Sequence, residues 1–181
     1  MTRVLVAFGS SEGQTATIAE RVGDILESEG CEPTLVHLKH PPSGLDVTAY
    51  DGVVVGASIH VGSHQGYVTE FVRENLEALN RQPSAFFSVS LTAAHTDPAE
   101  REPARELLES FLEETNWEPD TTLTVAGAIK YSEYGLVKRF VMRRITRKAS
   151  GDTDTSRDYE YTDWDEVEAF ALELSSAISV E

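Results

Sequence analysis

The chain has 181 residues, a formal net charge of −16 and 40% hydrophobic residues, which is typical of one globular domain over residues 1–181 with a sizeable core. The acidic charge argues against a nucleic-acid partner, since phosphate binding needs a basic surface. One cysteine cannot form an internal disulfide, no apolar run reaches the roughly 18 residues of a membrane span, and no signal peptide is recognisable, so we expect a cytoplasmic protein.

Short apolar runs that alternate with helical spacing predict an α/β fold. In chain order the predicted elements are a strand at residues 3–8, a helix at 15–30, strands at 33–38 and 51–58, a helix at 66–80, a strand at 84–91, a helix opened by Asp97 and Pro98, a strand at 121–129 and a last helix capped by Thr162 and Asp163. The short link between the second and third strands, with a loop at 41–44, leaves room for an undetected helix. This alternation predicts a doubly wound, five-stranded parallel sheet with helices on both faces.

The loop that joins the first strand to the first helix predicts a phosphate site. Its residues are Ser10, Ser11, Glu12, Gly13, Gln14 and Thr15. The first N–H groups of a helix lack partners and the helix dipole favours an anion, while hydroxyls add donors and Gly13 allows a close backbone approach. Neither Gly-Lys-Ser/Thr nor G-x-G-x-x-G occurs here, so the loop is not of the triphosphate or dinucleotide type. The pattern resembles the phosphate loop of flavodoxins, which implies flavin mononucleotide (FMN); the alternative is an ordinary polar turn with a helix cap.

Two further loops follow strand ends at the same edge of the predicted sheet. Their candidate cofactor-binding residues are Ala57, Ser58, Ile59 and His60 after the third strand, and Ser90, Leu91, Thr92 and Ala93 after the fourth. In a flavodoxin fold these loops flank the isoalloxazine ring, and small residues let backbone amides approach it. His60 and His95 are the candidates for a catalytic role, as donors to the ring or to a substrate carboxylate. The alternative for each is a solvated loop histidine, and we assign no general base.

The stretch from Lys130 to Lys148 breaks the alternation and has the opposite charge from the rest of the chain. It holds seven basic residues and one acidic residue, a net charge of +6, so the remaining chain carries −22. The candidates for substrate or membrane contact are Lys138, Arg139, Arg143, Arg144 and Arg147. They could lie on an anionic membrane or clamp substrate carboxylates; the alternative is a surface helix that neutralises nearby acids. The acids elsewhere are spread along nearly the whole chain, which favours salt adaptation over an acidic docking face.

Eight motifs, spread nearly end to end, together form a specific pattern. They are Glu-Gly-Gln-Thr at 12–15, Tyr-Asp-Gly-Val-Val-Val-Gly-Ala-Ser-Ile at 50–59, Glu-Phe-Val at 70–72, Pro-Ser-Ala-Phe-Phe-Ser-Val at 83–89, Trp-Glu-Pro-Asp at 117–120, Ala-Gly-Ala-Ile-Lys-Tyr at 126–131, Gly-Asp-Thr-Asp-Thr at 151–155 and Tyr-Thr-Asp-Trp at 161–164. With these motifs the chain resembles the FMN-containing, menaquinone-dependent protoporphyrinogen IX dehydrogenases, which are flavodoxin-like enzymes of haem biosynthesis.

The resemblance implies an FMN-dependent oxidoreductase that oxidises protoporphyrinogen IX to protoporphyrin IX with a quinone as electron acceptor. It also implies an insert near the fifth strand, at about residues 130–155, whose basic residues could meet the porphyrinogen propionates or the inner face of the cell membrane. FMN carries the chemistry, and no metal is expected. Two other functions stay open: a flavodoxin-type electron carrier, whose acidic surface suits a basic partner, and an FMN-dependent NAD(P)H:quinone reductase. A homo-oligomer also stays open.

Overall fold

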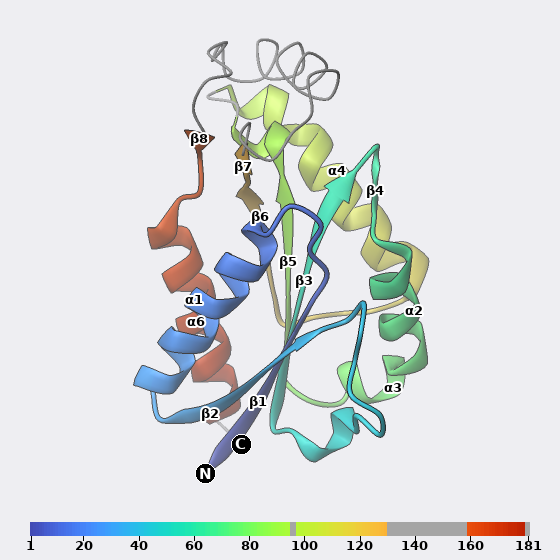
Figure 1. The fold of residues 1–181 in the computed structure, drawn as a ribbon, viewed down its shortest axis with the longest axis vertical. Helices are drawn as coiled ribbons and strands as arrows, with labels where there is room; N and C mark the ends of the chain where they lie inside the picture. Colours follow the sequence, from blue (N-terminus) through green and yellow to red (C-terminus); the bar gives the residue numbers. More distant parts are fainter. Residues whose placement is uncertain (95–96, 130–158, 180–181) are drawn as a thin grey trace.

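The centre of the fold is a parallel sheet of five strands (Figure 1). The computed structural model describes residues 1–94, 97–129 and 159–179. The five strands are β1 (Thr2–Phe8), β2 (Cys31–His37), β3 (Gly52–His60), β5 (Ser84–Ser90) and β6 (Thr121–Ala126), in the order β2-β1-β3-β5-β6. Every neighbouring pair in this order is parallel, so the predicted sheet is confirmed. One extra short strand, β4 (Ser63–His64), pairs antiparallel with the end of β3.

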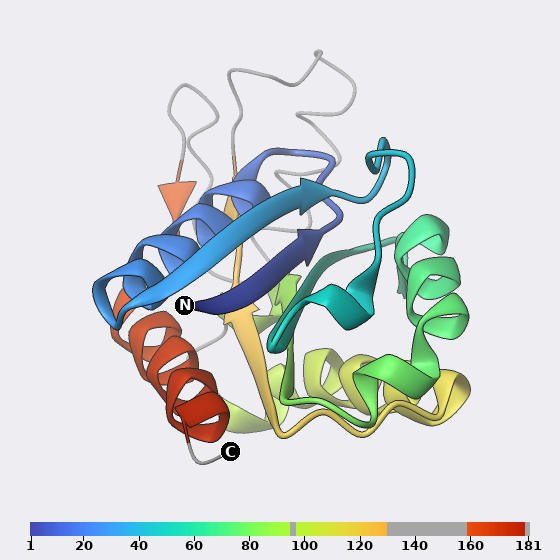
Figure 2. The same cartoon turned by 90° about the horizontal axis from the view of Figure 1, so that it is seen from below.

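Helices cover both faces of the sheet, as the alternation predicts (Figure 2). The long helices α1 (Gln14–Ser28) and α6 (Trp164–Ser179) lie together on one face. The other face carries α2 (Gly66–Glu74), α3 (Leu76–Leu79) and α4 (Pro98–Thr115). The strands are therefore buried on both sides, which explains why β1 reads as a continuous apolar run rather than an alternating one.

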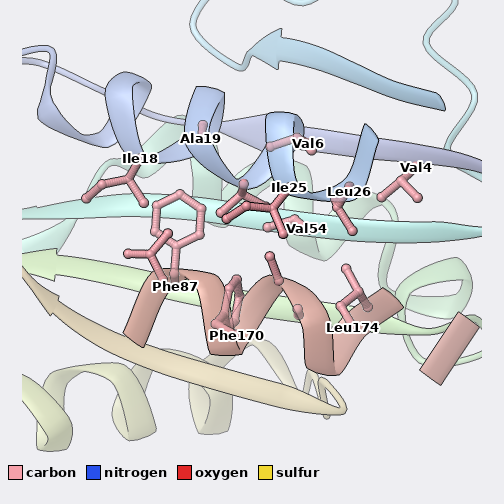
Figure 3. Packing of buried hydrophobic residues seen from close by; sticks show 14 of the residues in the cluster. Val4, Val6, Ile18, Ala19, Ile25, Leu26, Val54, Phe87, Phe170 and Leu174 are labelled. Carbon is pink, nitrogen blue, oxygen red and sulfur yellow. The ribbon is translucent and has the colours of Figure 1, made fainter. Parts of the chain in front are cut away.

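Two hydrophobic cores fill the spaces between the sheet and its helices. In the first, Ile18 and Leu26 of α1 pack in one cluster with Phe170 and Leu174 of α6, and the Phe87 ring lies beside Ile18 (Figure 3). The second core holds the aromatic rings of Phe86, Phe111 and Trp117, with Phe86 stacked on Phe111 at 4.8 Å between ring centroids. Trp117 is 1% exposed, and its indole N–H donates to the Ser84 hydroxyl at 3.1 Å, so burial leaves this donor satisfied.

Two predicted boundaries are wrong, each for a local reason, and the short link before β3 holds one helical turn. The helix predicted at 66–80 is interrupted at Asn75, whose side-chain amide donates to the Phe71 carbonyl oxygen at 2.9 Å and competes with the helical pattern. The strand predicted at 121–129 ends at Ala126, after which β7 (Ala128–Ile129) leaves the sheet to pair antiparallel with β8 (Tyr159–Glu160). The link before β3 contains only the 3₁₀ turn η1 (Val47–Ala49), capped by Asp46.

The strand order creates a switch point between β1 and β3. The chain passes through α1 to reach β2 on one side of β1, and then returns to place β3 on the other side. Connections that diverge in this way leave a crevice at the carboxyl ends of the two strands, where open α/β sheets bind ligands. In the described part of the chain, no helix has both the length and the apolar character that crossing a bilayer requires.

Candidate functional site

The loop between β1 and α1 depends on two glycines. Gly9 is buried at the end of β1, and its N–H donates to the Gly56 carbonyl oxygen of β3 at 2.9 Å. A Cβ atom at Gly9 would lie 2.5 Å from Cγ2 of Val68, so no larger residue fits without movement of α2. Gly13 has a φ of 89°, in the left-handed region that glycine adopts readily. The chain can therefore turn directly from the carboxyl end of β1 into α1.

Ser10, at the start of this loop, is held by three neighbours. The His37 ring lies with Nε2 3.2 Å from the Ser10 carbonyl oxygen, while the Lys39 N–H donates to Nδ1 at 3.1 Å. Because Nδ1 accepts that bond, Nε2 carries the proton and donates to Ser10. Burial raises the pKa of Tyr67, and a hydrogen bond from the Ser10 backbone opposes part of that rise. The Ser10 hydroxyl in turn accepts the Gly13 N–H at 3.0 Å, so the loop is preorganised.

The start of α1 differs from the starts of α4 and α6. Asp97 caps α4 by accepting a first-turn N–H at 2.9 Å. Asp163 caps α6, where its Oδ1 accepts the N–H groups of Asp165 and Glu166 at 3.1 and 3.3 Å. Within the described residues no side chain caps α1, whose N-cap is Gly13. Since the first N–H groups of a helix carry the positive end of its dipole, this junction suits an added anion.

All six residues of the predicted phosphate loop lie at this junction. Ser11 is exposed, Ser10, Glu12 and Gly13 are half-buried, and Gln14 and Thr15 are 7% and 2% exposed. None of the six is basic, so an anion here would be bound by hydroxyls and backbone amides. The structure brings these residues together, and their role toward a phosphate stays a prediction.

The loop predicted after the third strand is a tight hairpin at the carboxyl end of β3 (Figure 1). Ile59 and His60 of β3 pair with His64 and Ser63 of β4. The turn between them is Val61-Gly62, with φ values of 50° and 80°, which is the pattern of a type I′ hairpin turn. Glycine suits the second position, but valine is β-branched and carries strain at positive φ.

Gln65, which the sequence interpretation missed, ties the base of this hairpin together. Its Oε1 accepts the Ser58 N–H at 3.1 Å, and its Nε2 donates to the Ser58 hydroxyl at 2.5 Å. Along β3 the predicted residues pass from buried Ala57, through half-buried Ser58 and Ile59, to exposed His60. His60 is therefore open to a ligand that approaches from solvent.

His64 lies behind the hairpin and anchors it to the second core. Its Nε2 is 2.8 Å from the Ser88 hydroxyl of β5, and its ring centroid is 4.9 Å from that of Phe111 and 5.6 Å from that of Phe86. Burial lowers the pKa of His64 to about 4, so the ring is neutral at pH 7. A neutral imidazole in an aromatic pocket is a structural anchor, and no pattern of neighbouring residues indicates that His64 is buried.

The loop predicted after the fourth strand is η2 (Leu91–Ala94), which follows β5 directly. Ser90 is 7% exposed, and its carbonyl oxygen accepts the Gly127 N–H at 3.3 Å, so this loop is joined to the end of β6. Leu91 and Ala93 are half-buried, and Thr92 lies between them in η2. The catalytic candidate His95 lies outside the described residues.

The ribbon of β7 and β8 leaves the sheet at the edge where the three loops gather (Figure 1). The Tyr161 N–H donates to the Gly127 carbonyl oxygen at 3.3 Å, directly after β6. Both described ends of the predicted insert therefore lie at the carboxyl edge of the sheet. The basic candidates in the insert, Lys138, Arg139, Arg143, Arg144 and Arg147, lie outside the described residues.

The sheet order, the switch point and the preorganised loop together define the doubly wound, flavodoxin-like class of proteins. A family model described as a flavodoxin domain matches residues 5–156. The chain belongs to this flavodoxin-domain family and, within it, to the protoporphyrinogen IX dehydrogenases. It is an oxidoreductase, and its family implies a flavin cofactor.

Individual relatives are similar over nearly the whole chain. The protoporphyrinogen IX dehydrogenase (quinone) of Escherichia coli strain K12 is 35% identical over 176 residues, which cover 96% of this chain and 94% of that protein. The protein of the same name from Leishmania major is 29% identical over 96% of this chain and 75% of its own length. A solved flavodoxin from the domain Archaea aligns over 98% of this chain and 99% of its own, with a TM-score of 0.57 and 15% identity, which supports the fold alone.

Proposed function

We propose that this chain binds one FMN at the carboxyl edge of its sheet and oxidises protoporphyrinogen IX to protoporphyrin IX, with a quinone as electron acceptor. The observation that carries the proposal is the 35% identity to the Escherichia coli enzyme of that name over 96% of the chain. The loop geometry supports the cofactor independently, because it offers a phosphate a helix start without a side-chain cap beside the held hydroxyl of Ser10.

The loop from Ser10 to Thr15 holds the FMN phosphate in this proposal. The Ser10 hydroxyl accepts the Gly13 N–H, which leaves its proton for donation to a phosphate oxygen. Exposed Ser11 adds a second hydroxyl, and the first turn of α1 adds backbone amides and the helix dipole. The half-buried Glu12 contributes its backbone, because a carboxylate repels a phosphate.

Two loops flank the isoalloxazine ring in this proposal. The residues Ala57 to His60 form one wall, and the residues Ser90 to Ala93 form the other. FMN, when bound, supplies the two-electron redox chemistry. The chain positions the ring and the substrate, and the exposed His60 donates a hydrogen bond to the ring or to a propionate. His95 is the second candidate for that role.

The overall reaction balances with three quinones per porphyrinogen. The substrate loses six electrons and six protons in three equal steps, and each quinone takes up two of each to form a quinol. An acceptor dissolved in lipid must be met at a membrane, and the basic insert supplies the charge for it. We propose that Lys138, Arg139, Arg143, Arg144 and Arg147 contact an anionic membrane or the porphyrinogen propionates, with menaquinone as the acceptor.

The test has a cofactor part and a turnover part. Purified protein should be yellow, release FMN rather than FAD on heating, and produce porphyrin fluorescence from protoporphyrinogen only when a quinone is present. FMN-loaded protein without quinone-dependent porphyrin formation would refute the assignment of the substrate. A stable one-electron state without turnover would instead indicate an electron carrier, and steady NADH-driven quinone reduction would indicate a nicotinamide-dependent reductase.

A further inference from the structure

Thr162 lies next to the phosphate loop although 148 positions separate it from Gln14 in the sequence. Its Oγ1 accepts a hydrogen bond from Nε2 of Gln14 at 2.8 Å and donates one to the Ala126 carbonyl oxygen at 2.9 Å. Asp163, the next residue, caps α6, and the Tyr161 N–H before it bonds the Gly127 carbonyl oxygen. Thr162 is therefore fixed from both sides by backbone contacts that do not involve α1.

The proton on the Thr162 hydroxyl determines how the Gln14 amide is oriented. A carbonyl oxygen can only accept, so the single hydroxyl proton must point to Ala126. The hydroxyl oxygen then has only lone pairs left for Gln14, which must present its NH₂ group. The two bonds thus select one orientation of an amide that is 7% exposed.

Gln14 is also the first residue of α1, directly after Gly13 in the left-handed region. Glycine restrains its own backbone weakly, so the direction of the first helical N–H groups depends on contacts made on either side of it. On the loop side the contact is the Ser10 hydroxyl, at 3.0 Å from the Gly13 nitrogen. On the helix side the contact is the side chain of Gln14, which bonds Thr162. The Thr162 hydroxyl in turn bonds the carbonyl oxygen of Ala126, the last residue of β6.

We propose that Thr162 is a positioning residue for the cofactor phosphate: through Gln14 it holds the start of α1 in the orientation that binds a phosphate monoester. The proposal rests on the proposed function, since it concerns the FMN site. Thr162 acts through Gln14 and does not contact the ligand, so its effect is confined to the phosphate end of the ligand. Riboflavin has the same ring as FMN but no phosphate, and its binding is therefore independent of Thr162.

The test compares the dissociation constants of FMN and riboflavin for the apoprotein, measured by quenching of flavin fluorescence. In Thr162→Val the hydroxyl is replaced at nearly constant shape, and the FMN constant should rise about tenfold, the typical effect of one lost hydrogen bond to a buried group. The riboflavin constant should stay unchanged. Thr162→Ser, which keeps the hydroxyl, should restore FMN binding.

Thr121→Val is the matched control. Thr121 lies at the opposite end of β6, and its hydroxyl donates to Oε2 of Glu173 in α6 at 2.8 Å. This substitution removes a threonine hydroxyl hydrogen bond at the far end of the same strand, so it should lower the melting temperature and leave FMN binding unchanged. A Thr162→Val protein that is folded and binds FMN as tightly as the original chain overturns the proposal.

A double-variant cycle separates this proposal from the proposed function. Gln14→Leu breaks the same bond from the other end. The double variant with Thr162→Val should therefore bind FMN little more weakly than whichever single variant binds it less tightly. Fully additive losses would show that the two residues act separately, and would overturn the positioning role. If the unaltered chain bound neither flavin, the proposed function itself would fail, and this inference would fail with it.

Discussion

Gly9→Ala should damage the cofactor site through contact alone. Gly9 has no positive φ, so alanine meets no backbone penalty, but its Cβ would lie 2.5 Å from Cγ2 of Val68 and 3.0 Å from Cε2 of Tyr67. Val68 is fully buried, and Tyr67 holds the Ser10 backbone, so neither can yield freely. Overpacking of this kind costs about 1–3 kcal/mol. For a chain of this length the melting temperature should fall by about 3–10 °C, measured by circular dichroism.

The same substitution should weaken FMN binding, because a displaced Tyr67 releases Ser10 from its position in the loop. Gly66→Ala is the matched control: it lies at the first position of α2, one residue before Tyr67, and its Cβ would have nothing within 4 Å. That control should be neutral or stabilising by up to about 1 kcal/mol. Val68→Ala should partly rescue Gly9→Ala by making room for the new methyl group. Equal melting temperatures for Gly9→Ala and Gly66→Ala would refute the steric argument.

Three further predictions concern stability, and each is checked by equilibrium unfolding in urea. Burial lowers the pKa of His64 from 6.5 to about 4. Between these two pH values the unfolded chain binds a proton at His64 that the folded chain does not. The free energy of unfolding should therefore keep its full value above pH 6.5 and fall by up to about 3 kcal/mol toward pH 4. His64→Gln should flatten this slope, and an unchanged slope would contradict the burial of the ring. Val61→Asn should stabilise the chain by about 1 kcal/mol, since asparagine tolerates the left-handed turn position that valine strains; a loss of stability would contradict that account. A net charge of −16 predicts that raising KCl from about 0.1 to about 2 M increases stability by screening self-repulsion, and no dependence on KCl would argue against salt adaptation.

The sheet could be predicted because its signals are local. The apolar run of β1 and the glycine that ends it appear within eight adjacent positions, and burial on both faces follows from such a run alone. The break at Asn75 could not be predicted with equal ease. Asparagine tolerates a helix interior moderately well, and the outcome depends on the bond its amide makes to Phe71.

The loops of the candidate site could be predicted from the sequence, but the residues that hold these loops in place could not. Ser10 and Gly13 stand out because hydroxyls and glycine at a strand-to-helix junction suit a phosphate, although the same residue types also form ordinary capped turns. His37 and Thr162 act on that junction from 27 and 148 positions away, so only the strand order brings them to it. A usable signal did exist for His37: it lies one residue before the end of the second predicted strand, and parallel strands place their carboxyl ends at one edge. Of the two predicted caps of the last helix, Asp163 is confirmed, while the Thr162 hydroxyl bonds Gln14 and Ala126 instead.

The unequal capping of the helices connects stability to ligand binding. Asp97 and Asp163 each cap a helix, and a side-chain cap typically contributes about 1 kcal/mol. Gly13 gives α1 no such bond, and an aspartate in its place would meet a φ of 89° and put a carboxylate where the anion is expected. The start of α1 is therefore stabilised less than the starts of α4 and α6 until an anion binds. A ligand that binds only the folded state stabilises it by RT ln(1 + [L]/Kd). FMN should therefore stabilise the start of α1, and the gain should grow with the logarithm of its affinity. The free energy of unfolding and the affinity for FMN should thus change together in variants of this loop. In variants at the amino-terminal ends of the strands, the free energy of unfolding should change without a change in FMN affinity.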